Sequence, residues 1–125
     1  IVICPSNPYL SVDPLLALPG LREALASAPP PVIAVSPIVG GAAVKGPTAK
    51  IMCELNLPVT TASVAEHYRG LVDGLVIDES DAAEAATLDL PVLATGTVMH
   101  TVEDKERLAR AVLDFTHSLK AGDAP

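Results

Sequence analysis

The residues best suited to holding a small ligand lie in two short stretches. Ser6, Asn7 and Pro8 directly follow an apolar run at residues 1–4, and they offer a hydroxyl, a carboxamide and a fixed turn. A carboxamide presents one acceptor and two donors, which matches the edge of a nucleobase or a ribose. These residues therefore predict the lip of a binding site, with a plain connection between a strand and a helix as the alternative.

The second stretch is rich in glycine and contains a lysine. Gly40 and Gly41 let the backbone approach a ligand closely, and Lys45 and Gly46 precede a predicted helix with unpaired N–H groups at its start. Together they predict a cradle for a phosphate or pyrophosphate group, although the glycine spacing differs from that of a Walker loop. The alternative is a glycine-rich loop with a solvated lysine.

Acidic side chains gather where a third strand is expected to end. Asp78, Glu79 and Asp81 supply oxygen atoms of the kind that bind Mg²⁺, which makes Asp78 and Asp81 candidate metal ligands. The alternative is that these acids cap the next helix. Residues 95–99 leave a fourth strand, and both contact with a ligand and a plain loop are open there. The sequence has no Gly-x-Ser-x-Gly elbow, so it does not predict a hydrolase.

Short apolar runs separated by proline, glycine and helical patterns predict a parallel α/β sheet. Buried strands are expected at residues 1–4, 32–35, 74–78 and 91–95, helices at 21–28, 48–55, 64–69, 82–88 and 102–121, and a connection at 36–46. Thr60, Thr61 and Ser63 are candidate N-caps of the third helix, and Ser63 with Glu66 has the spacing of a capping box. Strands that alternate with helices favour right-handed crossovers. We therefore expect residues 1–125 to form one unit with a three-layer, Rossmann-like parallel sheet flanked by helices.

Composition excludes several classes of function. The net charge is −7 and the chain has only eight Lys and Arg, which argues against a nucleic-acid partner. No apolar run reaches the length of a membrane span, so no membrane partner is expected. Cys4 and Cys53 have no disulfide or metal spacing, and we expect them to be small buried hydrophobes of a reducing, cytoplasmic compartment.

Several stretches together resemble the 2-phospho-L-lactate transferases. The first runs from Cys4 to residue 25, the second covers residues 35–41 and the third covers residues 44–50. His67-Tyr68, the strand end at residues 76–78, and Thr97 with Met99 follow in the order of that family. The resemblance implies a guanosine nucleotide site at Ser6, Asn7, Pro8, Ser36, Gly40, Gly41, Lys45 and Gly46.

That family acts in the biosynthesis of coenzyme F-420. Its members transfer a 2-phospholactyl group, or a phosphoenolpyruvyl group in some bacteria, from a guanosine diphosphate adduct to the deazaflavin alcohol Fo. They release GMP and need magnesium. The resemblance implies the same substrates and a requirement for Mg²⁺ here.

The family resemblance covers only part of a full member. Family members are more than twice as long and begin with a glycine-rich nucleotide loop, whereas this chain opens inside a strand pattern. We therefore expect the C-terminal part of a larger domain, with the metal and Fo ligands elsewhere and little or no activity in isolation. An apolar sheet edge would favour a homodimer. The alternative function is that of a non-catalytic, nucleotide-sugar-binding regulatory protein with the same fold.

Overall fold

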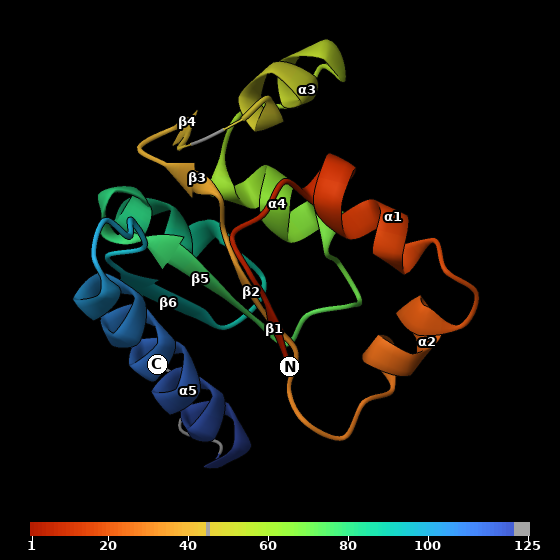
Figure 1. Ribbon diagram of the computed structural model, residues 1–125, viewed down its shortest axis with the longest axis vertical. Coiled ribbons are helices and arrows are strands. Elements are labelled where there is room, and N and C mark those ends of the chain that lie inside the picture. Colours follow the sequence, from red (N-terminus) through yellow and green to blue (C-terminus); the bar gives the residue numbers. More distant parts are fainter. Residues whose placement is uncertain (45, 122–125) are drawn as a thin grey trace.

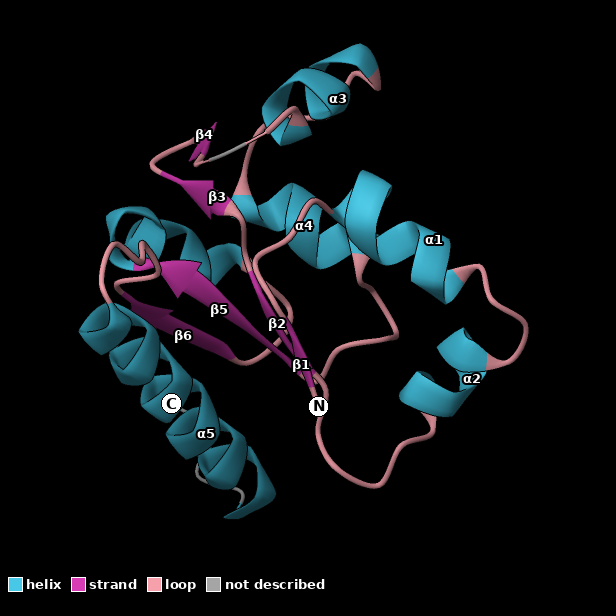
Figure 2. Ribbon diagram, viewed as in Figure 1, coloured by secondary structure: helices cyan, strands magenta, loops and turns pink. Residues whose placement is uncertain are grey.

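A four-stranded parallel sheet forms the middle layer of the molecule (Figures 1 and 2). The computed structural model describes residues 1–44 and 46–121. The strands lie in the order β1-β2-β5-β6, which are Val2–Ile3, Ile33–Val35, Gly74–Asp78 and Val92–Thr95. In the register of the central strands, Ile33 pairs with Gly74 and Leu75 pairs with Val92. The predicted α/β fold with a parallel sheet is confirmed.

Helical segments and one small hairpin connect the strands. After β1 come a π-helical turn (Pro8–Val12), α1 (Asp13–Leu16) and α2 (Leu21–Ala26). After β2 come the antiparallel pair β3 (Ile38–Val39) and β4 (Ala42–Ala43), then α3 (Thr48–Glu54) and α4 (Thr61–His67). A 3₁₀ segment (Glu79–Thr87) leads to β6, and α5 (Val102–Ala121) follows.

Side chains of the central strands alternate between two cores, because successive residues of a strand point to opposite faces. Ala34, Leu75 and Ile77 pack on one face with buried residues of the connecting helices, namely Val12, Met52, Val64, Tyr68 and Leu71. On the other face, Ile33, Val35 and Val76 pack against the apolar stripe of α5, formed by Leu108, Val112 and Phe115. The sheet is therefore covered on both faces, as the three-layer prediction required.

The direction of the crossovers explains why the helices that connect the strands lie on one face of the sheet, whereas α5 lies on the other. Each strand lies next to the one that precedes it in the sheet, so the chain always advances the same way across the sheet. Right-handed crossovers in one direction place their connections on one face. Figure 1 shows α1 and α4 on that face and α5 on the other. All four strands then end at the same edge of the sheet, where their exit loops come together.

The first strand is shorter and more exposed than predicted. β1 has two residues and lies at the edge of the sheet, where Val2 is 45% exposed. Cys4 follows the strand and is exposed, and so is Cys53 on α3. The prediction that these cysteines are buried is wrong, because an edge strand is covered on one side only and α3 buries only Thr48 and Met52.

Three local predictions are also corrected. α4 is capped by Thr60, whose Oγ1 accepts a hydrogen bond from the amide of Ser63 at 3.2 Å, so Ser63 is not the N-cap. Residues 38–43 form a hairpin rather than an irregular connection. The helix expected at residues 82–88 begins at Glu79 and is a 3₁₀ helix, with Asp78 as its N-cap.

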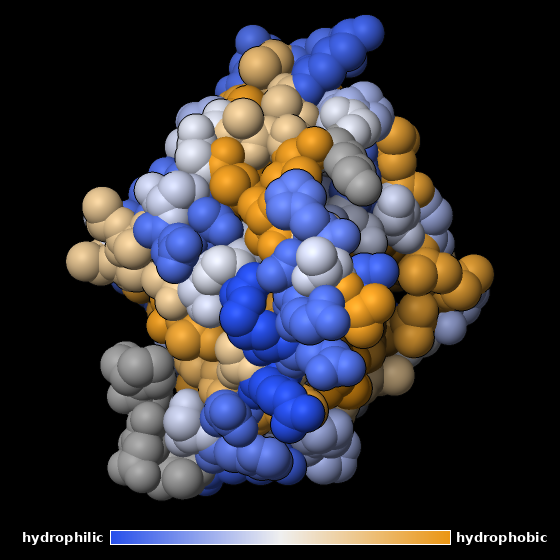
Figure 3. Space-filling view, turned by 60° about the vertical axis from the view of Figure 1, so that its left-hand side comes forward, coloured by the Kyte–Doolittle hydropathy of each residue, from blue (hydrophilic) through white to orange (hydrophobic). Residues whose placement is uncertain are grey.

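The exposed face of α5 is hydrophilic and lies between two apolar parts of the surface. Its outward face carries Glu103, Glu106 and Arg110, and Figure 3 shows a hydrophilic band with apolar surface on both sides. None of the helices within residues 1–44 and 46–121 combines the length and the apolarity needed to cross a bilayer.

Candidate functional site

A pocket of about 200 Å³ lies where the strands end. The exits of β1, β2 and β6 each contribute to it, and the β3–β4 hairpin and the start of α3 complete it. Its described lining is Pro5, Asn7, Ser36, Pro37, Val39, Val44, Thr48, Thr97, Val98, Met99 and His100. Crevices at the carboxyl ends of parallel strands are the usual ligand sites of open α/β sheets.

The two polar atoms of the Asn7 side chain differ in their hydrogen bonding. Its Oδ1 accepts hydrogen bonds from the amides of Tyr9 at 2.9 Å and Leu10 at 3.1 Å, which caps the π-helical turn that begins at Pro8. Its Nδ2 is buried and finds no hydrogen-bond partner among the described residues. Buried polar groups are nearly always paired, so an unpaired donor on a residue that lines a pocket points to a ligand.

The segment that carries Asn7 is held in place by α4. The Nε2 of His67 lies 2.7 Å from Oδ1 of Asp13, and the rings of His67 and Tyr9 meet edge to face with their centroids 4.8 Å apart. These contacts join α4 to both ends of the π-helical turn. They restrict the motion of the loop, so Asn7 keeps a fixed position at the lip of the pocket.

Ser36 sits at the exit of β2 and is almost completely buried, with 1% of its surface exposed. Its amide donates to the carbonyl of Val76 at 2.8 Å, which continues the sheet. Its Oγ accepts a hydrogen bond from the amide of Ile38 at 3.1 Å. The hydroxyl hydrogen remains available to the pocket, because an oxygen that accepts one bond can still donate one.

The glycines of the predicted phosphate cradle form a hairpin turn, and their role in phosphate binding stays a prediction. Gly40 and Gly41 have φ angles of 59° and 73°, and they form the tight turn of the β3–β4 hairpin. Two successive residues with positive φ are typical of such turns, and glycine adopts this conformation without strain. The amide of Gly40 donates to Oδ2 of Asp81 at 2.9 Å. The hairpin therefore presents Val39 and Val44 to the pocket instead of glycine backbone.

The predicted nucleotide residues fall into three groups. Asn7 and Ser36 line the pocket. Ser6, Pro8, Gly40, Gly41 and Gly46 are described but are not among its lining residues. Lys45 lies outside the described residues.

The two candidate metal ligands act as hydrogen-bond acceptors for the chain itself. Oδ1 of Asp78 accepts from the amide of Ser80 at 3.0 Å and from its hydroxyl at 2.7 Å, and Oδ2 accepts from the amide of Thr97 at 2.9 Å and from its hydroxyl at 3.0 Å. Asp81 holds the hairpin through Gly40. Within the described ranges, no group of three or more His, Cys, Asp or Glu side chains is placed to hold a metal ion. Asp78 is the N-cap of the 3₁₀ segment, as the alternative interpretation expected of these acids. Asp81 stabilises the turn of the hairpin.

Burial and hydrogen bonding act in opposite directions on Asp78. Burial raises the pKa of its carboxyl, but the four hydrogen bonds from Ser80 and Thr97 outweigh that effect and bring the pKa to about 2. Hydrogen bonds to a carboxylate favour its charged form. Asp78 is therefore ionised at neutral pH, and its charge fixes Thr97 in the wall of the pocket.

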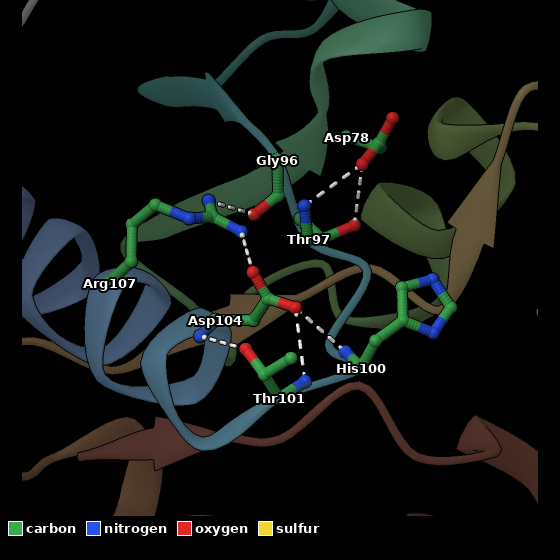
Figure 4. A network of polar contacts seen from close by, with 7 residues as sticks. All are labelled: Asp78, Gly96, Thr97, His100, Thr101, Asp104 and Arg107. Carbon is green, nitrogen blue, oxygen red and sulfur yellow. Dashed lines mark hydrogen bonds and ion pairs between the residues drawn. The ribbon is translucent and has the colours of Figure 1, made fainter.

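The loop between β6 and α5 forms one wall and is clamped at three points (Figure 4). Asp78 holds Thr97, and Nη1 of Arg107 donates to the carbonyl of Gly96 at 2.9 Å. Oδ2 of Asp104 accepts from the amides of His100 at 2.9 Å and Thr101 at 3.1 Å. Among the residues that line the pocket, Thr97 and Met99 belong to the fourth strand exit named from the sequence, whereas the sequence did not predict His100.

The pocket differs in charge from the protein as a whole. The chain has a net charge of −7, yet no Asp or Glu is found among the described lining residues. The polar groups that line it include an amide donor and hydroxyls, from Asn7, Ser36, Thr48 and Thr97, together with the imidazole of His100. A described lining that offers donors and holds no carboxylate suits an anionic or carbonyl-rich ligand.

Residues 1–115 match the family described as 2-phospho-L-lactate transferase CofD. The chain belongs to this family. It is 42% identical over 119 residues to the 2-phospho-L-lactate transferase of Methanocaldococcus jannaschii, which covers 95% of the chain and 38% of that relative. It is 38% identical over 125 residues to the phosphoenolpyruvate transferase of Streptomyces griseus subsp. griseus, which covers 97% of the chain and 39% of that relative. The chain thus spans somewhat more than a third of the length of these CofD proteins.

Proposed function

We propose that the pocket binds a guanosine diphosphate moiety and that the whole protein is a transferase of coenzyme F-420 biosynthesis. The donor is a guanosine diphosphate adduct of 2-phospholactate or phosphoenolpyruvate, and the acceptor is the deazaflavin alcohol Fo. The supporting observation is the pocket at the strand ends, whose described lining holds no Asp or Glu and includes Asn7, whose Nδ2 has no partner among the residues that the structure describes. Membership in the CofD family supports the choice of reaction.

The proposed reaction asks the protein for position and charge compensation. The hydroxyl oxygen of Fo forms a bond to the phosphorus that carries the lactate or enolpyruvate oxygen, the bond from that phosphorus to the bridging oxygen breaks so that GMP leaves, and the hydroxyl proton is released to solvent. Phosphoryl transfer depends chiefly on alignment and electrostatic stabilisation rather than on a protein nucleophile. Donors from Asn7 and Ser36 would hold the nucleotide, so that its diphosphate stays in line with the acceptor.

The described residues do not fit the Mg²⁺ ion that the family resemblance implies. Asp78, which contacts the lining residue Thr97, already accepts four hydrogen bonds, and Asp81 accepts one from the amide of Gly40. We therefore assign no metal ligand in this part of the protein, and no step of the proposal depends on one.

The substitution Asn7→Asp tests the proposal. It keeps an oxygen in the place of Oδ1 to cap the π-helical turn, but it replaces the Nδ2 donor with an acceptor and adds a negative charge. We expect GDP affinity, measured by isothermal titration calorimetry, to fall by about tenfold or more, the loss expected of one hydrogen bond to a charged or buried group. Asn56→Asp, at an exposed position beyond the far end of α3, adds the same charge and serves as the control.

Two results would contradict the proposal. One is an unchanged dissociation constant for GDP in Asn7→Asp, which would remove Asn7 from the site. The other is preferential binding of UDP-sugars over GDP by the unmodified chain, which would favour a nucleotide-sugar-binding regulatory protein.

A further inference from the structure

Only one side chain among the described lining residues of the pocket can carry a charge. That residue is His100, and the others are apolar or neutral. His100 is exposed, so its imidazole is accessible to a ligand that enters from solvent. An imidazole donates a hydrogen bond in either tautomer and becomes a cation when it is protonated.

The backbone of His100 is fixed although its side chain is exposed. The carboxylate of Asp104 accepts the amide of His100 at 2.9 Å and that of Thr101 at 3.1 Å, and the amide of Asp104 donates to Oγ1 of Thr101 at 3.1 Å. This reciprocal pattern caps the start of α5. The amides of His100 and Thr101 lower the pKa of Asp104, so the acid that holds the loop is ionised at neutral pH.

The imidazole is directed away from the acid that holds its backbone. In Figure 4 the ring of His100 extends to the side opposite Asp104. The negative charge of Asp104 also has a partner, because Nη2 of Arg107 lies 3.5 Å from its Oδ1. The ring is therefore free to meet a ligand, and the fixed loop reduces the conformational entropy lost on binding.

A hydrogen-bond donor on this rim suits an anion rather than a metal. No carboxylate among the described lining residues accompanies His100, and the described ranges hold no cluster of three or more metal-ligating side chains. The other polar side chains that line the pocket include further donors, among them the hydroxyl of Thr48 and the amide Nδ2 of Asn7. Charge-assisted hydrogen bonds to phosphate oxygens are stronger than neutral ones.

We propose that His100 contacts the diphosphate of the bound nucleotide, whereas Asn7 and Ser36 hold the uncharged nucleoside. This inference rests on the proposed function and deepens it, because it separates the phosphate end of the pocket from the nucleoside end. His100 is thereby the residue that distinguishes a nucleoside diphosphate from a nucleoside. Asp104 and Arg107 are positioning residues that act through the loop.

The test compares GDP with guanosine by isothermal titration calorimetry, with the 125-residue chain and three variants. In His100→Ala we expect GDP to bind about tenfold more weakly and guanosine to change by less than about twofold, since only GDP loses a charge-assisted hydrogen bond. His100→Arg keeps N–H donors at this position and should stay within about threefold of the unmodified chain for GDP. His117→Ala, an exposed histidine farther along α5, is the matched control and should change neither affinity.

The outcomes separate this inference from the proposal that it rests on. If the unmodified chain binds GDP and Asn7→Asp weakens it, but His100→Ala affects GDP and guanosine equally or not at all, only the assignment of His100 is overturned. If the unmodified chain binds no GDP, both proposals are overturned. His100 is exposed, so circular dichroism should show the same helix content in both His100 variants as in the unmodified chain.

Discussion

Asp78 allows a quantitative test of how the wall of the pocket is held. The substitution Asp78→Asn keeps the size of the side chain but removes its charge and one of its two acceptor oxygens. Four donors surround the carboxylate, two from Ser80 and two from Thr97. Because an amide presents one oxygen and one NH₂ group, it can satisfy only one of these donor pairs, and its NH₂ group faces the other pair.

The magnitude follows from the pKa of Asp78. Its value of about 2 lies below the ordinary value of 3.8, and each unit of difference corresponds to about 1.4 kcal/mol. The charged form therefore contributes about 2 kcal/mol to the free energy of unfolding. Because the pKa is lower in the folded state, this contribution is complete well above pH 3.8 and is lost as the pH falls through about 2.

Urea unfolding followed by far-ultraviolet circular dichroism measures this contribution. At about pH 7 we expect Asp78→Asn to be less stable than the unmodified chain by about 2 kcal/mol, and at about pH 3 by roughly half as much. Asp114→Asn, at an exposed position on α5, removes the same charge and should change the stability by less than about 0.5 kcal/mol.

Two outcomes would refute this reasoning about Asp78. The first is an equal loss of stability in Asp78→Asn and Asp114→Asn, because a general effect of charge would then explain both. The second is a loss in Asp78→Asn that stays constant between about pH 7 and pH 3, because the hydrogen-bonded carboxylate would then not be the source of the stability.

Two further substitutions test the packing of the sheet and the start of α4. A Cβ added at Gly74 would lie 2.9 Å from Cε1 of Phe115 and 3.1 Å from Cδ1 of Ile33, so Gly74→Ala should lower the free energy of unfolding by about 1–3 kcal/mol; an unchanged urea midpoint would contradict the close approach of α5 to β5. Thr60→Ala removes the N-cap of α4 and should cost about 1 kcal/mol in the same assay, whereas Ser63→Ala should cost less; the reverse order would restore Ser63 as the cap.

The larger elements could be predicted from the sequence because their patterns are long and agree with one another. The apolar run at residues 74–78 is buried throughout in β5, and α5 buries the predicted stripe at Leu108, Val112 and Phe115. Proline and glycine mark most of the boundaries between these elements. Right-handed crossovers then place the strand ends at one edge of the sheet, so a site containing Asn7 and Ser36 could be anticipated.

The parts that were missed depend on competition between neighbouring residues. Thr60, Thr61 and Ser63 are all suitable N-caps, and only the structure shows that the helix begins at Thr61. Gly40 and Gly41 between β-branched and small residues favour a hairpin, which the structure shows in place of the expected irregular connection at residues 36–46; the phosphate cradle stays a prediction. A pair of glycines permits both structures, and the local sequence does not decide between them.

The wall formed by residues 97–100 could not be deduced from local sequence, because it depends on contacts across the fold. Thr97 is placed by Asp78, which is nineteen residues earlier in the chain, and Gly96 is placed by Arg107 on α5. The same contacts give Asp78 a role that the sequence does not distinguish from that of a metal ligand. An acid at the end of a strand has the same appearance whether it binds a cation or the next loop, and the donors around it make the difference.

The most direct test of the account is a nuclear magnetic resonance titration of the isotopically labelled chain with GDP. The account predicts that the amide signals of Asn7, Ser36, Thr97 and His100 shift together and saturate with one dissociation constant, because these residues line one pocket. The account would be contradicted if these signals stayed in place while those of Arg69, Gly70 and Asp89 shifted, since those residues line a separate cavity between α4 and the 3₁₀ segment.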